Sequence, residues 1–272
     1  MDIPASLVKE LRERTGLSLM ECKKALVETE GNLEKAIEVL RLKSGAKADK
    51  VAQRSASEGV IGAYVNEDST LGALVEVNCE TDFVGRNDDF LAFAHQAARV
   101  AAFSDAASVD ALMAISEDGK TLEVLRQELV MKVGENVAVR RFVRQVAQGR
   151  LALYVHGGKI GVLVDYEGQN PQIGKDLALH IAAMKPQWLE AKDVPQEVLA
   201  KEREIVMAQA SQSGKPEAVV EKMVEGRMGK FVNELTLLGQ AFVKDNSLSV
   251  GKWLAEHHTR VLSFHLLVLG GE

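Results

Sequence analysis

The fold of this chain is organised around the stretch Leu71–Phe93, which reads LGALVEVNCETDFVGRNDDFLAF. Leu71–Val77 has the apolar and β-branched composition of a strand, and Asp88–Phe93 begins a helix. Between them, Thr81–Val84 is expected to form a short turn in which an aromatic residue follows an acid. Phe83 either folds back into the core or projects from a rigid tip toward a partner. The local pattern alone favours the core, because large apolar side chains beside a strand are usually buried.

Regular patterns continue on both sides of this stretch. Gly59–Val65 alternates as a strand, and Asn66–Thr70 is expected to join it to Leu71–Val77 as a hairpin loop. The further elements expected in this half of the core are two helices and a third strand, Asp89–Phe103, Leu122–Lys132 and Val137–Val146. Residues 59–147 therefore predict a small antiparallel sheet with helices.

The hairpin recurs later in the chain. Gly149–Val155 (GRLALYV) resembles Gly59–Val65 (GVIGAYV), and Gly161–Val164 (GVLV) resembles Gly72–Val75 (GALV). We interpret this as an internal duplication. The second copy has GQNPQIG where the first has ETDFV, although a turn that only served a shared core would need a similar aromatic in both. The asymmetry favours a separate role for Phe83.

The second copy continues with helical patterns. A helix is expected to begin at Asp176, as one does at Asp89 in the first copy. Two amphipathic patterns then flank Gly214–Pro216 within the insertion Asp193–Leu238, which predicts an antiparallel helical hairpin. Val261–Leu269 is expected to be the strand that completes the second sheet.

The N-terminal residues predict a module of three short helices. Ala5–Arg14 has helical spacing and ends at Gly16, Ser18 begins a capping box with Glu21, and Asn32 caps the third helix. The apolar residues Leu17, Leu19 and Met20 near the second helix either pack in the small core or form an exposed docking patch beside basic side chains. Periodicity leaves both interpretations open.

The sequence therefore predicts an α+β fold in four parts. These are the three-helix module at 1–44, a small and basic linker at 45–58, a first core subdomain at 59–147 and a second at 148–272, with the helical hairpin inserted at about 193–238.

The composition excludes several classes of protein. The 33 Lys and Arg against 39 Asp and Glu give the 272-residue chain a net charge of −6, a poor match to proteins that bind nucleic acid. No apolar run approaches the ~20 residues that span a bilayer, so no membrane association is expected. The N-terminus lacks the apolar region of a signal peptide. We therefore expect a cytoplasmic protein whose Cys22 and Cys79 are free thiols.

Motifs for nucleotide binding and catalysis are missing from the sequence. Neither G-x-x-x-x-G-K-[ST] nor G-x-G-x-x-G occurs, so no direct nucleotide site is expected. The six histidines show no H-E-x-x-H spacing, and there is no G-x-S-x-G nucleophile motif. An enzyme using His156 or His180 is an alternative without a supporting motif.

Eight blocks of the chain resemble the bacterial translation elongation factor Ts family. The block most specific to the family is EVNCETDFV at Glu76–Val84. The others follow in the family's order over nearly the whole chain: VKELRERTG (Val8–Gly16), MECKKAL (Met20–Leu26), GNLEKAIE (Gly31–Glu38), KVGENVAVRR (Lys132–Arg141), YVHGGKIGVLV (Tyr154–Val164), HIAAMKP (His180–Pro186) and SGKPEAVVEKMVEGRMGKF (Ser213–Phe231). The resemblance implies that the N-terminal helices form a ubiquitin-associated-like module.

The resemblance also implies a function. Members of the family exchange guanine nucleotide on elongation factor Tu without catalysing a reaction and without a cofactor of their own. Carried over to this chain, the tip that disturbs the Mg²⁺ and phosphate site of that partner is Thr81, Asp82, Phe83 and Val84. The docking residues are Arg12, Met20, Lys23, Val133 and His156. A dimer of two such heterodimers is compatible with the resemblance. The alternative is an adaptor that binds a partner only through the N-terminal module.

Overall fold

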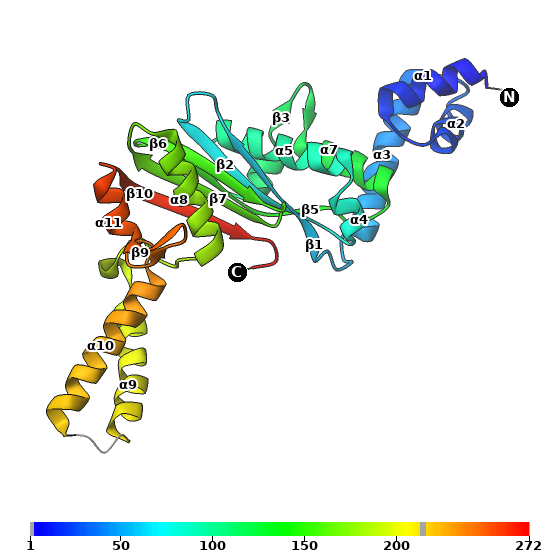
Figure 1. Ribbon diagram of the computed structural model, residues 1–272. Helices are drawn as coiled ribbons and strands as arrows, with labels where there is room; N and C mark the ends of the chain where they lie inside the picture. Colours follow the sequence, from blue (N-terminus) through cyan, green and yellow to red (C-terminus); the bar gives the residue numbers. More distant parts are fainter. Residues whose placement is uncertain (1–2, 213–215, 272) are drawn as a thin grey trace. The chain divides into compact units, whose positions relative to one another are not determined.

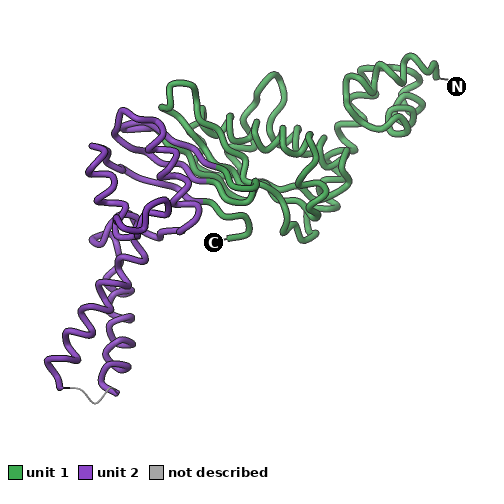
Figure 2. Tube along the Cα trace, in the orientation of Figure 1, with its two compact units in different colours: residues 1–146, 155–161, 267–272 green, residues 147–154, 162–266 purple. Residues whose placement is uncertain are grey.

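Figure 1 shows a computed structural model that describes residues 3–212 and 216–271. The chain divides into two compact units (Figure 2). Unit 1 contains residues 1–146, 155–161 and 267–272, and unit 2 contains residues 147–154 and 162–266. Helices and small antiparallel sheets make up both units, so the α+β fold class is confirmed. No helix among the described residues combines the length and apolar character needed to cross a membrane.

Unit 1 begins with three helices, α1 (Ala5–Thr15), α2 (Leu19–Glu28) and α3 (Leu33–Val51). Gly16 ends α1 with a left-handed φ of 69°, and the side chains of Ser18 and Asn32 accept backbone N–H bonds at the starts of α2 and α3. A small core lies between the helices, with Leu11, Cys22, Ala25, Leu26 and Ala36 fully buried.

Helix α3 extends through half of the segment that was expected to be a linker. The helix ends at Val51 instead of near Ser44, because Ser44, Ala48 and Val51 are buried on one face. Ala48 and Val51 belong to the core of the following subdomain, and the Lys47 ammonium donates to the Met131 carbonyl at 3.0 Å. Residues 45–51 of the expected linker are therefore helical, and their small residue Ala48 packs in the core of the following subdomain.

The sheet of unit 1 contains β1 (Glu58–Val65), β2 (Leu71–Cys79) and β5 (Ala138–Val146), with β2 in the centre. Both pairings are antiparallel. The helices and the two-residue strands of this part are α4 (Asp82–Gly85), α5 (Asp88–Phe103), α6 (Val109–Met113), β3 (Ser116–Glu117), β4 (Lys120–Thr121) and α7 (Leu122–Val133). Helix α5 lies so close to β1 that a Cβ on Gly62 would be 2.3 Å from the Ala94 carbonyl oxygen.

Unit 2 repeats this topology. Its sheet contains β6 (Arg150–His156), β7 (Ile160–Glu167) and β10 (Arg260–Val268), again with the second strand of the hairpin in the centre. Helix α8 (Pro171–Met184) lies against β7, since a Cβ on Gly174 would be 2.4 Å from the Tyr166 ring. The close approach of helix and sheet uses a strand glycine in the first copy and a helix glycine in the second. The equivalent strand orders agree with the duplication inferred from the sequence.

Helix α8 begins five residues earlier than expected. The prediction placed its start at Asp176, but Asn170 caps the helix by accepting the Gln172 N–H at 2.9 Å, and Pro171 occupies the first turn. The remaining elements of unit 2 are a 3-10 turn, the two long helices, two short strands and a last helix: η1 (Ala191–Asp193), α9 (Gln196–Ser211), α10 (Glu217–Leu235), β8 (Ala241–Phe242), β9 (Asp245–Ser249) and α11 (Val250–Glu256).

The two long helices α9 and α10 form the inserted hairpin (Figure 1). Val206, Ala210 and Val224 are buried between them. The Gly214–Pro216 turn that the sequence placed here lies outside the described residues, except for Pro216.

Candidate partner-binding site

The tip, Thr81–Val84, overlaps the one-turn helix α4 that follows the central strand β2. Val84 packs against the core of unit 1 and Gly85 is buried, whereas the Phe83 side chain is 83% exposed. Successive residues of a helix are about 100° apart, so a turn that directs Val84 inward directs Phe83 outward. The local expectation that Phe83 folds into the core is therefore wrong.

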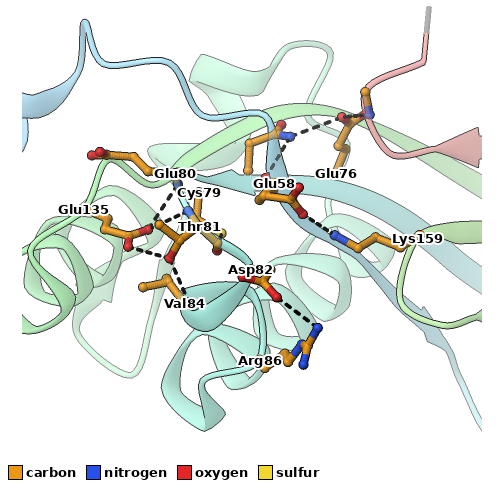
Figure 3. A network of polar contacts seen from close by, with 12 residues as sticks. Glu58, Glu76, Cys79, Glu80, Thr81, Asp82, Val84, Arg86, Glu135 and Lys159 are labelled. Carbon is orange, nitrogen blue, oxygen red and sulfur yellow. Dashed lines mark hydrogen bonds and ion pairs between the residues drawn. The ribbon is translucent and has the colours of Figure 1, made fainter.

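Hydrogen bonds hold the beginning of the tip. The Thr81 N–H donates to Glu135 Oε2 at 3.0 Å, and its hydroxyl donates to Glu135 Oε1 at 2.6 Å. The same hydroxyl oxygen caps α4 by accepting the Val84 N–H at 3.4 Å. Figure 3 shows these bonds on one side of α4. Thr81 is therefore an anchor within the chain.

The tip also packs closely on the end of the sheet. The buried Cys79 thiol donates to the Thr81 carbonyl oxygen at 3.1 Å. Burial, with the nearby Glu135 carboxylate, raises the pKa of this thiol to about 11, so the sulfur keeps its proton at neutral pH. Gly59 adopts φ 141°, and a Cβ there would be 2.0 Å from the Val77 carbonyl oxygen, so no other residue fits this close pairing.

The exposed end of the tip carries charge. Asp82 Oδ2 pairs with Arg86 Nη2 at 2.9 Å, across one turn of the chain, and both side chains reach solvent (Figure 3). Asn87 then caps α5 by accepting the N–H groups of Asp89 and Phe90. The tip thus ends at a second helix cap, and it presents a phenyl ring beside an exposed acid.

The docking residues expected on the N-terminal helices are exposed. Met20 is 62% exposed, and Arg12 and Lys23 also face solvent. A groove on α2 is lined by Met20, Lys23, Lys24, Val27 and Glu28. Leu17 is buried and Leu19 is half exposed, so the apolar residues of this region divide between the core and the surface.

Val133 lies just before the segment that binds the tip, and His156 lies on a segment that contacts β1. Val133 ends α7, packs against the core and precedes Glu135 by two residues. His156 is exposed at the end of β6, in the segment 155–161 of unit 1. The turn after it contacts β1, because the Ile61 N–H donates to the Gly158 carbonyl and Lys159 pairs with Glu58, both at 2.7 Å. The tip helix α4 also contacts β1.

The sequence did not identify the residues that hold the tip. Glu135 and Asn136 occur in the KVGENVAVRR block, but the resemblance assigned a docking role only to Val133 there. No local signal marks Glu135, because the groups that it binds belong to Glu80 and Thr81, 55 and 54 positions earlier in the chain. Arg86, the partner of Asp82, was also missed.

Of the two histidines considered for an enzyme, His156 and His180, the second is held by contacts within the chain. His180 is fully buried, its Nδ1 accepts the Val243 N–H at 3.1 Å, and its Nε2 lies 3.0 Å from Gln240 Oε1. Burial lowers the pKa of His180 and favours the neutral ring. Within residues 3–212 and 216–271, no three His, Cys, Asp or Glu side chains are grouped closely enough to hold a metal ion.

Comparison with known proteins covers both units. The family model described as Elongation factor TS matches residues 80–271. Elongation factor Ts of Nitrosospira multiformis is 52% identical over 99% of this chain and 90% of its own length. The proteins of the same name from Methylococcus capsulatus and Chromobacterium violaceum are 54% and 51% identical over 97% and 99% of this chain, which is 91% and 92% of their lengths. With the exposed tip formed by the ETDFV sequence, these matches show that the chain belongs to the elongation factor Ts family.

Proposed function

We propose that this chain is a guanine-nucleotide exchange factor that binds elongation factor Tu in the cytoplasm and promotes the release of its GDP. The supporting observation is Phe83, a phenyl ring 83% exposed on a tip whose backbone is held by hydrogen bonds. Aromatic anchors of this kind dominate the energetics of many protein interfaces. A ring that only contributed to stability would be buried.

In the proposed mechanism the tip enters the GTPase domain of elongation factor Tu. There Phe83 packs between elements that carry the Mg²⁺ ligands and displaces them, which weakens the hold on the phosphates. Burial of one Phe side chain contributes ~1.5–3 kcal/mol. Typical coupling energies between two ligands are of the same order, about 1–3 kcal/mol, so Phe83 can supply only part of the effect.

The remaining binding energy is assigned to a wider docking surface. Arg12, Met20 and Lys23 on the N-terminal helices would contact the partner at a separate place, and Val133 and His156 would contact it beside the tip. These contacts need not distinguish the loaded partner from the empty one. The tip does distinguish them, because only interactions that favour the nucleotide-free form accelerate release.

In the proposed activity no covalent bond is made or broken. Because coupling is reciprocal, the chain weakens GDP binding by the factor by which GDP weakens binding of the chain. After GDP has left, GTP binds the empty site and displaces the chain in turn. The direction of exchange then follows the concentrations of the two nucleotides.

The proposal is tested by release of labelled GDP from elongation factor Tu. The partner is loaded with fluorescent GDP, mixed with excess unlabelled GDP, and followed with increasing amounts of this chain. We expect the release rate to rise with concentration and to saturate. An adaptor that binds only through the N-terminal module would bind the partner and leave the rate unchanged, and that result would contradict the proposal.

A further inference from the structure

We infer that Glu135 is a positioning residue for the tip: its carboxylate sets the orientation in which Phe83 is presented. This inference rests on the exchange function proposed above. The two oxygens of Glu135 accept three hydrogen bonds from consecutive residues, from Glu80 N–H at 3.1 Å, Thr81 N–H at 3.0 Å and the Thr81 hydroxyl at 2.6 Å. Figure 3 shows the carboxylate facing the start of the tip.

The carboxylate determines how Thr81 caps α4. When the hydroxyl hydrogen points to Glu135, a lone pair of Oγ1 is left for the Val84 N–H. The Thr81 carbonyl oxygen accepts from Gly85 N–H and from the Cys79 thiol, both at 3.1 Å. Every polar group of Thr81 therefore has a hydrogen-bond partner, and both of its donors, the N–H and the hydroxyl, donate to Glu135. Charged acceptors make the strongest bonds of this kind.

Glu135 is itself fixed from both sides. Gly134 ends α7 in the left-handed conformation, with φ 81° and its N–H bonded to the Val130 carbonyl at 2.9 Å. The Asn136 N–H donates to Glu80 Oε1 at 2.7 Å, so Glu80 and Glu135 bind each other's loops reciprocally. The backbone on both sides of the carboxylate is thus held by hydrogen bonds.

Asn136 extends this arrangement to the end of the N-terminal helices. Its side-chain amide donates to the carbonyl oxygens of Ala52 and Arg54, at 3.2 and 2.9 Å. The three segments 52–54, 79–81 and 134–136 form one hydrogen-bonded unit, and α4 starts from it. A group held in its bound orientation loses less conformational freedom on binding, so the arrangement increases the effect of Phe83.

Glu135 therefore acts through Phe83, and this leads to a specific kinetic expectation. Loss of the carboxylate leaves the docking surface intact but lets the tip adopt several orientations. The maximal release rate should fall, whereas the concentration that gives half of it should change little. A residue needed only for folding would lower the fraction of active protein and would not depend on Phe83.

The test uses the full chain with Glu135→Ala and Glu135→Gln, each also combined with Phe83→Ala. Gln keeps the size of the side chain but replaces one acceptor oxygen by an NH₂ group, so it still tests the inference if the Ala variant melts below the assay temperature. Glu128→Gln is the matched control, because Glu128 lies on α7, the helix just before Glu135, and pairs with Lys120 at the surface. Release of labelled GDP is measured over a range of factor concentrations.

We expect Glu135→Ala to lower the maximal rate about tenfold, to change the half-saturating concentration less than about threefold, and to have no further effect in the Phe83→Ala background. Glu135→Gln should lie between this variant and the wild type. The inference is overturned if the maximal release rates of both Glu135 variants equal that of Glu128→Gln. It is also overturned if the Glu135 substitutions lower the rate by the same factor in the Phe83→Ala background as in the wild-type background. A wild-type chain that does not stimulate release overturns the proposed function instead.

Discussion

Neighbouring residues of the tip have opposite roles. Thr81 hydrogen-bonds to Glu135 and Val84 packs against the core of unit 1, while Phe83 between them is exposed. A single turn of helix can separate these roles because its side chains radiate in different directions. The hydrogen bonds of Thr81 stabilise the turn, so we expect the fold to persist without the Phe83 ring.

Substitution of Phe83 should hardly affect stability. Phe83→Ala is expected to change the free energy of unfolding by less than about 0.5 kcal/mol, because the ring is exposed. The matched control is Phe90→Ala on α5, whose ring is fully buried and should cost about 3–5 kcal/mol. Urea unfolding measures both. A loss for Phe83→Ala similar to that for Phe90→Ala would show that the ring packs inside.

At this scale the local pattern predicted a turn at Thr81–Val84 but favoured the wrong direction for Phe83. The pattern around Phe83 is that of an ordinary strand end, and the indications of an outward ring were the missing counterpart in the second copy and the family resemblance. The tip begins at Thr81, whose N–H and hydroxyl donate to the Glu135 carboxylate, more than fifty positions away in the chain. Local periodicity contains no information on such a contact.

Among the elements, strand β2 connects the tip to the rest of unit 1. It is the central strand, and its Glu76 is fully buried. The Glu76 carboxylate accepts from Arg141 Nε at 2.7 Å, Gly270 N–H at 2.9 Å and Arg140 Nη1 at 3.1 Å. Three residues after Glu76 the strand ends at Cys79, so this network fixes the strand from which the tip departs.

The network predicts a dependence of stability on pH. Burial alone would raise the pKa of Glu76, but the bonds from Gly270, Arg141 and Arg140 outweigh it and hold the pKa below its ordinary value of 4.5. A lowered pKa means that the folded chain resists protonation. The stabilisation is therefore complete above about pH 4.5 and is lost as the pH falls through the lowered pKa.

Glu76→Gln isolates this contribution. At neutral pH we expect it to lower the free energy of unfolding by about 1–3 kcal/mol, at the modest end for a buried charge, because both arginines are partly exposed and can be hydrated. The difference from the wild type should shrink below about pH 4.5. Chemical unfolding over a series of pH values provides the measurement. A difference that is constant from pH 3 to pH 7 would exclude a role for the Glu76 charge.

Element boundaries were predictable where capping residues mark them. Ser18, Asn32 and Gly16 were recognised, and the helices start or end there. The end of α3 was missed because its last turns bury small residues against another subdomain, which composition does not reveal. The start of α8 differs from the prediction because Asn170 and Pro171 are residue types typical of turns as well as of helix starts.

At the scale of the whole molecule, the same topology occurs twice, with a different sequence between sheet and helix in each copy. Both copies build a three-stranded sheet with a helix after the hairpin, but only the first has the ETDFV sequence before that helix. The sequence predicted the duplication, the three N-terminal helices and the inserted helical hairpin. The short strands β8 and β9 and helix α11 were not predicted, because segments of two to seven residues contain too few positions to establish a period.

The docking surface on the N-terminal helices should control affinity rather than rate. Met20→Glu places a charge on an exposed apolar position, so the fold should persist while contact with the partner weakens. We expect the half-saturating concentration in GDP release to rise about tenfold or more, with an unchanged maximal rate. The control is Leu42→Glu, another exposed apolar residue, on α3. Equal effects of the two variants would contradict a specific docking role for Met20.

The central claim is that Phe83 accelerates release of GDP from elongation factor Tu. Its most direct test is the maximal release rate of labelled GDP with Phe83→Ala, compared with Phe103→Ala, which removes another exposed phenyl ring from the same unit. We predict that Phe83→Ala lowers the stimulated rate by at least about tenfold, corresponding to ~1.4 kcal/mol, whereas Phe103→Ala retains the wild-type rate. Full stimulation by Phe83→Ala would contradict the account.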